Sequence, residues 1–317
     1  MHGIVSARNC ALLLENGGHV SITKGWAKSI LHRMNYVKRK GSNARKVSIS
    51  CFSELRNVFL RDIQAEVVMN DIPKDLIFNW DQTAIQLVPT GDWTMNEAKA
   101  KKVVIANSDD KRQITAVLAA TMTGEYLPTQ LIYKGKTTRC HPKVSFLEGW
   151  DVWHSDNHWS NEDTMERYIL NIIIPYVCHK REVLKLQACH PALAIIDCFK
   201  GQTTPRILSL LRENNIIPLI VPANCTDKLQ PIDVSINKPI KHQMRTRFQS
   251  WYADEVQRQL KEMPIDKVKV DLTAPVVKTN CARWLIAAVQ NLQERLVVAI
   301  NGFKESGILA AVDAVVD

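Results

Sequence analysis

The sequence predicts a mixed α/β fold in which helices flank both faces of a five-stranded sheet, with a small helical piece at the N-terminus. Three observations predict it: apolar segments with strand-like patterning, a later succession of strand, helix and strand, and 46% hydrophobic residues in a chain of 317. A chain of this size can bury one large core. No apolar run approaches the roughly 20 residues of a membrane-spanning helix, and the start lacks a signal-peptide pattern. We therefore expect an intracellular protein without membrane contact.

The first 50 residues carry nearly all of the net charge. They hold nine basic side chains and the single acid Glu15, whereas the other 267 residues contribute only +1 to the total of +9. This concentration predicts contact with a polyanion, and nucleic acid is the leading candidate. The alternative is a solvated basic tail or an import signal. The candidate DNA-binding residues are Lys24, Lys28, Arg33, Lys38, Arg39 and Lys40.

The same region has the pattern of two short helices. Apolar residues from Thr23 to Met34 recur at helical spacing, and Gly17 and Gly18 predict a turn after the apolar segment 11–14. Such a pair fits a helix-turn-helix laid against phosphates. We expect residues 1–46 to be part of a DNA-binding unit and residues 47–70 to form a linker helix.

The next part of the chain predicts antiparallel strands. A short buried strand is expected at Leu76–Phe78, with Asp81 just past its end. The segments Val103–Ala106, Ile114–Met122 and Leu127–Tyr133 read as an antiparallel meander with a turn at residues 123–125. A helix should follow from Ser160, capped by Ser160 together with Asp163.

The second half of the sheet is predicted as strand, helix and strand. The apolar run Leu193–Ile196 ends at Asp197, Thr204 and Pro205 open a helix, and residues 216–222 return as a strand. A last helix is expected from Cys281 to Ile300. We therefore assign residues 71–260 to the sheet domain and residues 261–317 to a helical extension.

Three carboxylates can converge in this arrangement. Asp81 follows one strand, Asp197 ends another, and Asp233 begins a helix after Pro231, so the three meet at one edge if the two strands are neighbours. Clustered carboxylates repel one another. Mg²⁺ or Mn²⁺ ions remove that penalty, and two ions about 4 Å apart promote phosphoryl transfer. The competing interpretation of Asp197 is a strand that ends at a turn.

Other polar residues are weaker candidates. Asp227 is expected to cap a loop, and His154 and His158 either reach the active edge or lie on the surface. A basic loop (Lys134, Lys136 and Arg139) either contacts phosphates or is a solvated tip. The eight cysteines include no Cys-x-x-Cys pair, so they predict neither a disulfide framework nor an ordinary zinc site.

Three segments of the chain resemble the signature blocks of a known family. "NWDQT", "IIDCFKGQ" and "VPANCTDKLQPIDVSINK" occur in the order found in DDE-type transposases of the mariner/pogo superfamily, in the Tigger, jerky and pogo branch. The resemblance covers about residues 70–255. It is specific because three separate blocks appear in the right order.

This resemblance implies a fold, a site and a chemistry. It implies a ribonuclease-H-like core and two Mg²⁺ (or Mn²⁺) ions, with Asp81, Asp197 and Asp233 as catalytic and metal-binding residues that cut and join double-stranded DNA. Residues 17–41 are similar to the end of a centromere-protein-B-like helix-turn-helix, which is truncated here. Cys198 departs from the family, which often places asparagine after the second acid.

The leading hypothesis is thus a transposon-derived, metal-dependent DNA endonuclease and strand transferase in the nucleus. A homodimer is one candidate assembly. A domesticated DNA-binding protein without cleavage is the alternative from another class. A ribonuclease-H-type nuclease acting on RNA hybrids would share the fold and the metals, but the basic N-terminal helix favours duplex DNA.

Overall fold

The computed structural model describes residues 10–21, 23, 25, 26, 29, 33, 49–89, 110–264 and 267–316. The chain divides into two compact units, Met1–Lys46 and Val47–Asp317. Among the described helices, none combines the length and the apolar character that crossing a membrane requires.

The described part of the N-terminal unit contains two 3-10 turns, η1 (Cys10–Leu12) and η2 (Leu14–Asn16). Gly17 ends η2 in the left-handed conformation with a φ of 83°, as a glycine turn requires. Helical backbone is found at a few described positions from Gly25 to Arg33, and Arg33 is exposed. The other candidate DNA-binding residues, Lys24, Lys28, Lys38, Arg39 and Lys40, lie outside the described residues.

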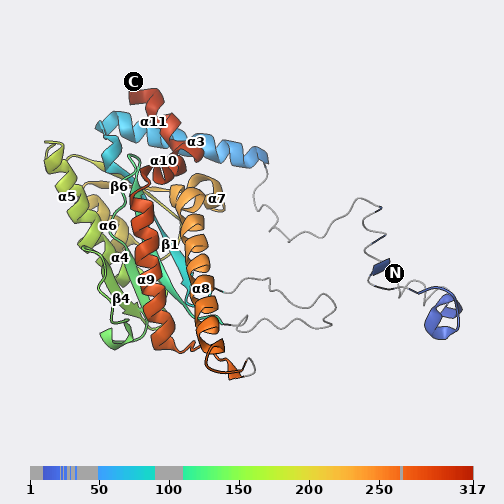
Figure 1. Ribbon diagram of the computed structural model, residues 1–317. Helices are drawn as coiled ribbons and strands as arrows, with labels where there is room; N and C mark the ends of the chain where they lie inside the picture. Colours follow the sequence, from blue (N-terminus) through green and yellow to red (C-terminus); the bar gives the residue numbers. More distant parts are fainter. Residues whose placement is uncertain are drawn as a thin grey trace. The chain divides into compact units, whose positions relative to one another are not determined.

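The described residues of the larger unit form a single sheet with the order β4-β3-β2-β1-β5-β6 (Figure 1). β1 runs antiparallel to β2 and β2 antiparallel to β3, whereas the other neighbours are parallel. The strands are β1 (Ile77–Gln86), β2 (Gln113–Thr121), β3 (Gln130–Lys134), β4 (Asp151–Ser155), β5 (Ala192–Ile196) and β6 (Ile216–Ile220). The strands β3, β2 and β1 form an antiparallel meander, β5 and β6 continue the sheet beside β1, and β4 extends it at the β3 edge.

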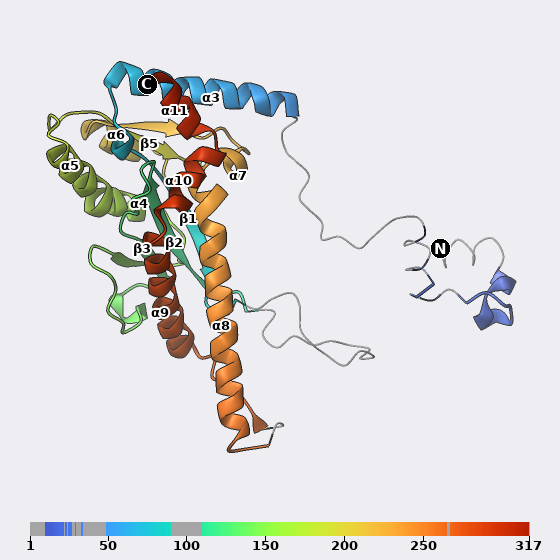
Figure 2. The same ribbon diagram turned by 45° about the horizontal axis from the view of Figure 1, so that its top comes forward.

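Helices cover both faces of this sheet (Figures 1 and 2). The helices of the first half are α3 (Ile49–Asn70), α4 (Glu162–Tyr168), α5 (Ile174–Val183) and α6 (Pro205–Glu213). Those of the second half are α7 (Thr226–Leu229), α8 (Asn237–Leu260), α9 (Ala274–Gln293), α10 (Leu296–Glu305) and α11 (Ile308–Val316). Shorter 3-10 or π-helical turns are η3 (Lys74–Leu76), η4 (Thr138–Cys140), η5 (Ile169–Ile173) and η6 (Ile232–Ile236).

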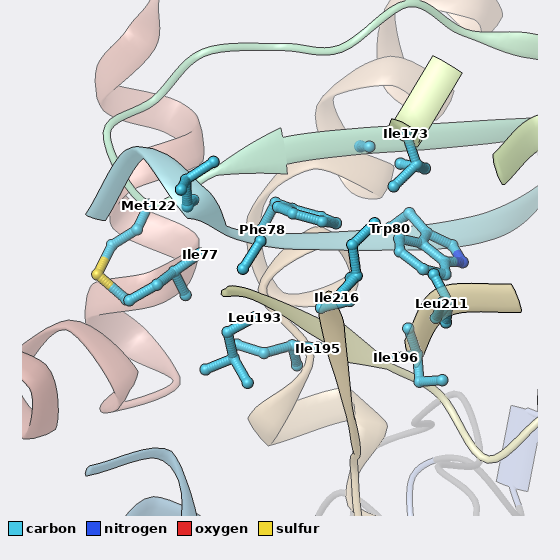
Figure 3. Packing of buried hydrophobic residues seen from close by; sticks show 14 of the residues in the cluster. Ile77, Phe78, Trp80, Met122, Ile173, Leu193, Ile195, Ile196, Leu211 and Ile216 are labelled. Atoms are coloured by element: carbon cyan, nitrogen blue, oxygen red, sulfur yellow. The ribbon is translucent and has the colours of Figure 1, made fainter. Parts of the chain in front are cut away.

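Two hydrophobic cores lie on opposite faces of the sheet because successive side chains of a strand alternate between its faces. Phe78 and Trp80 of β1 point into the first core, with Ile173 and Leu211 from the helices around α4 to α6 (Figure 3). Ile85 belongs to the second core, which the helices α8 and α9 cover. Asp81 has the same parity as Ile85, so its side chain points to the α8 face.

The predicted class, an α/β fold with a mixed sheet flanked by helices, is confirmed, but the described residues hold six strands instead of five. β4 was missed because it is a short edge strand whose side chains after Asp151 are only half-buried, so its pattern is weak. The first strand does not end at Phe78. β1 pairs with β2 as far as Gln86, and Asp81 therefore lies within the strand.

Two helix predictions also need correction. The cap of α4 is Asn161, which exchanges hydrogen bonds with Thr164, and not the pair Ser160 and Asp163. The C-terminal helix predicted from Cys281 to Ile300 is two helices, α9 and α10, which separate at residues 294–295. The predicted strand Val103–Ala106 lies outside the described residues.

The helices from both ends of the larger unit contribute to its hydrophobic cores. Phe59 and Ile63 of α3 share the first core with Ile308 and Val312 of α11. In the second core, α9 contributes Leu285 beside residues of β2 and β3. The subdivision of this unit at residues 70 and 260 stays a prediction.

Candidate active site

The strand register places two of the three predicted acids side by side. β1 and β5 are parallel neighbours, and Asn79 pairs with Ile195. Continuing this register by two residues aligns Asp81 with Asp197, which directly follows β5. Neighbouring strands lie about 4.8 Å apart. The expected adjacency of these two strands is confirmed.

A buried asparagine fixes the third element against this edge. Asn79 is fully buried, and its amide nitrogen donates to the Ile195 carbonyl at 2.8 Å. Its carbonyl oxygen accepts from the backbone N–H of Ile232 at 2.9 Å. Because Ile232 is the first residue of η6, this one side chain ties β1, β5 and η6 together.

The turn η6 presents Asp233 to the site. It is a single π-helical turn that leads directly into α8, and turns of this kind often mark functional sites. Asn237 opens α8, and its Nδ2 donates to Oδ2 of Asp81 and to Oδ1 of Asp233, both at 2.7 Å. Two carboxylates that are far apart in the sequence thus share one amide donor.

A second buried amide holds the segment that carries Asp197. Oε1 of Gln202 accepts from the Trp80 indole at 2.8 Å and from the Gln82 amide at 3.0 Å. Nε2 of Gln202 donates to the Asp197 carbonyl at 3.0 Å. The chain after β5 is therefore fixed to β1, and the half-buried Asp197 carboxylate accepts from the N–H of Cys198.

The electrostatics of the site are those of crowded negative charge. Asp81 is only 7% exposed. Burial, followed by repulsion from Asp233, raises the pKa of Asp81 to about 7, and Asp197 adds to the increase. The hydrogen bond from Asn237 opposes it. Among the described residues, no lysine or arginine forms an ion pair with any of the three acids.

This donor set fits hard divalent cations. Carboxylate oxygens are the ligands that Mg²⁺ and Mn²⁺ prefer, and a cation would replace the missing positive charge. Among the described residues, one group of three side chains has ligand atoms that all lie within 4.8 Å of one another. That group does not contain the three acids. The ligand atoms of the three acids therefore do not all lie within 4.8 Å of one another.

The structure places the other candidates as follows. Asp227 is exposed on α7. His154 lies on β4, three positions from β1 in the sheet order, where it contacts His141. Arg33 belongs to the N-terminal unit.

A row of basic side chains on α8 was missed by the sequence analysis. Lys238, Lys241 and Arg245 are exposed and follow one another at helical spacing along one face. Lys241 and Arg245 line a groove of about 270 Å³ together with Ala84 and Gln86 of β1. The recurrence of lysine and arginine directly after the third acid was the signal that could have revealed this row.

Comparison with known proteins agrees with this geometry. The model of the DDE superfamily endonuclease family matches residues 111–300. The chain belongs to this family. The matched region contains Asp197 and Asp233, whereas Asp81 precedes it. The resemblance found in the three sequence blocks is confirmed at the level of the family.

Curated relatives of this DDE family member carry the name of a transposable element. A human protein, "Pogo transposable element with KRAB domain", is 23% identical over 238 residues, which cover 75% of this chain and 37% of that protein. A second human protein, "Pogo transposable element with ZNF domain", is 21% identical over 198 residues, which cover 62% and 13%. The chain therefore spans little more than a third of the first relative and about an eighth of the second.

Among solved structures, a pre-cleavage Mos1 transpososome is similar to this family member. The similarity covers 93% of this chain and 78% of the Mos1 chain, with 14% identity and a TM-score of 0.46. The Mos1 mariner paired-end complex with Mn gives the same coverage, identity and TM-score.

Proposed function

We propose that this chain contains the catalytic domain of a transposon-derived DNA endonuclease and strand transferase. In this proposal Asp81, Asp197 and Asp233 hold two divalent cations, Mg²⁺ or Mn²⁺. The observation that carries it is the convergence of these acids, from two strands and a π-helical turn, around a carboxyl group with a raised pKa. Membership of the DDE superfamily endonuclease family supports the same chemistry.

The cations and the side chains of the site would have different roles. The cations would polarise the scissile phosphodiester and stabilise the attacking and leaving oxygens. Asn237 would hold the carboxylates of Asp81 and Asp233 in place through its shared amide donor. Asn79 and Gln202 would keep the three chain segments from separating, because each bonds to two of them.

The proposed substrate is double-stranded DNA. The exposed Lys241 and Arg245 on α8 lie along a groove beside β1 and would contact phosphates near the acids. The six basic residues of the N-terminal unit named above would add contacts to the duplex. Nuclear localisation and a homodimer belong to the same proposal. The basic N-terminus supports the nuclear part of the proposal. The homodimer is carried over from the sequence prediction.

Plasmid nicking in the presence of Mg²⁺ tests this function. We expect the parent protein to nick supercoiled DNA and the Asp197→Ala variant to lose nicking down to the background without enzyme. Asp227→Ala is the matched control, since it removes an exposed acid on α7 and should nick like the parent. Equal nicking by Asp197→Ala and the parent would overturn the catalytic assignment. Tight DNA binding without nicking by either protein would favour the domesticated DNA-binding alternative.

A further inference from the structure

A second cluster of metal-ligating side chains lies at the β4 edge of the sheet. Cys140 is the last residue of η4, His141 follows it, and His154 is on β4, where it pairs with Tyr133 of β3. Their ligand atoms all lie within 4.8 Å of one another. Nδ1 of His154 is 3.2 Å from Nε2 of His141. All three residues are half-buried.

The spacing of these atoms suits a tetrahedral ion. Zinc binds nitrogen at 2.0–2.1 Å and sulfur at about 2.3 Å, so two nitrogen ligands of one zinc ion are roughly 3.4 Å apart. The observed separation of the two imidazole nitrogens is close to this value. A thiolate with two imidazoles is also a donor set for Zn²⁺, unlike the all-oxygen set of the three aspartates.

We propose that Cys140, His141 and His154 form a zinc site that is separate from the acidic site. Sγ of Cys140, Nε2 of His141 and Nδ1 of His154 are the protein ligands, and a water molecule completes the tetrahedron. On binding, the Cys140 thiol loses its proton to solvent and the thiolate sulfur bonds to Zn²⁺, so no oxidant or reductant is needed.

The surrounding structure holds the three ligands in place. The N–H of Gly135 donates to the Ser155 carbonyl at 2.9 Å, which joins the loop before η4 to β4. A Cβ at Gly135 would lie 2.6 Å from Sγ of Cys140, so the close approach of the thiol needs glycine. Lys278 of α9 donates to the Cys140 carbonyl at 2.9 Å and so ties this loop to α9.

Aromatic rings fix the two imidazoles. The ring of Trp153 stacks on that of His154 at 4.7 Å between centroids, and Tyr133 lies 5.6 Å from His141. The two histidines come from different segments, and the metal would therefore cross-link them. The cross-link would fasten the exposed basic loop, which contains Lys136 and Arg139, to an edge strand of only five residues.

Cobalt substitution of the full-length protein tests the ligand set. Co²⁺ bound by a thiolate gives a ligand-to-metal charge-transfer absorption that carboxylate ligands do not give. We expect this band at one equivalent of Co²⁺ and its removal by one equivalent of Zn²⁺. Cys140→Ser should abolish the band and His154→Ala should abolish or strongly weaken it. Absence of the band in the parent protein would overturn the proposal.

Two control variants separate this site from other metal binding. Cys189→Ser removes an exposed cysteine outside the cluster and should keep the band. Asp81→Asn changes the acidic site and should also keep it, so the result is independent of the proposed nuclease function. A band that survives Cys140→Ser, or that disappears in Cys189→Ser, would overturn the assignment.

Thermal unfolding provides a second measurement that does not depend on colour. Saturating Zn²⁺ should raise the Tm of the parent by on the order of 5 °C, because a ligand that binds only the folded state stabilises it. Without metal, Cys140→Ser should melt close to the parent, and Zn²⁺ should not raise its Tm. An equal rise in both proteins would contradict the proposal.

Discussion

Asp81 combines a structural cost with a proposed function. A carboxylate in the middle of a strand would ordinarily face solvent, yet Asp81 is almost fully buried on the α8 face. The residues that tolerate it are polar and buried themselves, with Asn237 donating to it directly. The sequence could mark Asp81 as unusual, but only the folded chain shows that its charge has no cationic partner among the described side chains.

The raised pKa of Asp81 predicts a pH-dependent gain in stability for Asp81→Asn in metal-free protein. Its pKa is about 7 in the folded chain and about 3.9 in the unfolded chain. As the pH rises from 4 to 7, the unfolded state loses its proton first, so the parent loses stability. Asparagine does not ionise, and the variant should gain about 2 to 4 kcal/mol above pH 7 and almost nothing at pH 4.

Urea unfolding at several pH values in the presence of a chelator measures this difference. Asp227→Asn is the control, because Asp227 is exposed and its substitution should leave the free energy of unfolding nearly unchanged at every pH. Saturating Mg²⁺ should reduce the stability gain of Asp81→Asn over the parent, because the proposed cation offsets the repulsion that the substitution removes. A gain that does not change between pH 4 and pH 8 would show that crowded charge is not the cause.

At the scale of a single element, helix α8 connects the acidic site with a candidate path for DNA. Its first residue, Asn237, holds two of the acids, and Lys238, Lys241 and Arg245 follow on one exposed face. Exposed charged side chains contribute little to stability. Contact with phosphates is therefore the role that we propose for this row beside β1.

We expect the double variant Lys241→Glu/Arg245→Glu to bind duplex DNA at least about 10-fold more weakly than the parent. Each lost phosphate contact should also reduce the slope of log affinity against log salt by about 0.9. Fluorescence anisotropy with labelled duplex at several salt concentrations measures both quantities. Lys304→Glu, on the exposed side of α10, is the control and should have little effect. It changes half as many charges, so a loss of log affinity about half that of the double variant would indicate a general charge effect and not a path along α8.

The elements that sequence reasoning predicted well are those with strong local patterns. The Thr204 cap with Pro205 gave α6, and the apolar run before Asp197 gave β5. The extension of β1 through Asp81 depends on pairing with β2, and the edge strand β4 depends on pairing with β3. Pairing between distant segments leaves little trace in a local pattern.

The two proposed metal sites differ in the same way. The acids were predicted because each stood at an expected strand or helix end and matched a family block. The proposed zinc ligands were not predicted, because Cys140 and His141 are adjacent and fit no ordinary zinc spacing. His154 lies near them only because β4 pairs with β3. Asn79, Gln202 and Asn237 were missed for a related reason, since their roles rest on buried contacts across the sheet.

At the scale of the whole molecule, charge and fold are divided between two units. The unit Val47–Asp317 holds the sheet, both cores and the three acids, whereas most of the net charge belongs to Met1–Lys46. Within the larger unit, α3 and α11 pack together, and the Gln64 amide donates to the Ala311 carbonyl at 2.9 Å. The larger unit thus contains the contacts expected of an independently folding domain.

A fragment of residues 47–317 should therefore fold, melt close to the full chain and keep Mg²⁺-dependent nicking at saturating DNA. Its affinity for duplex DNA should fall, because the N-terminal cations are removed. If the six candidate basic residues each contact a phosphate, the salt slope should decrease by about 5. A full-length variant with these six residues changed to glutamine separates charge from fold and should bind like the fragment. If the fragment and the glutamine variant both keep the affinity and the salt slope of the parent, the N-terminal cations do not contact DNA. The basic row on α8 would then be the proposed contact surface.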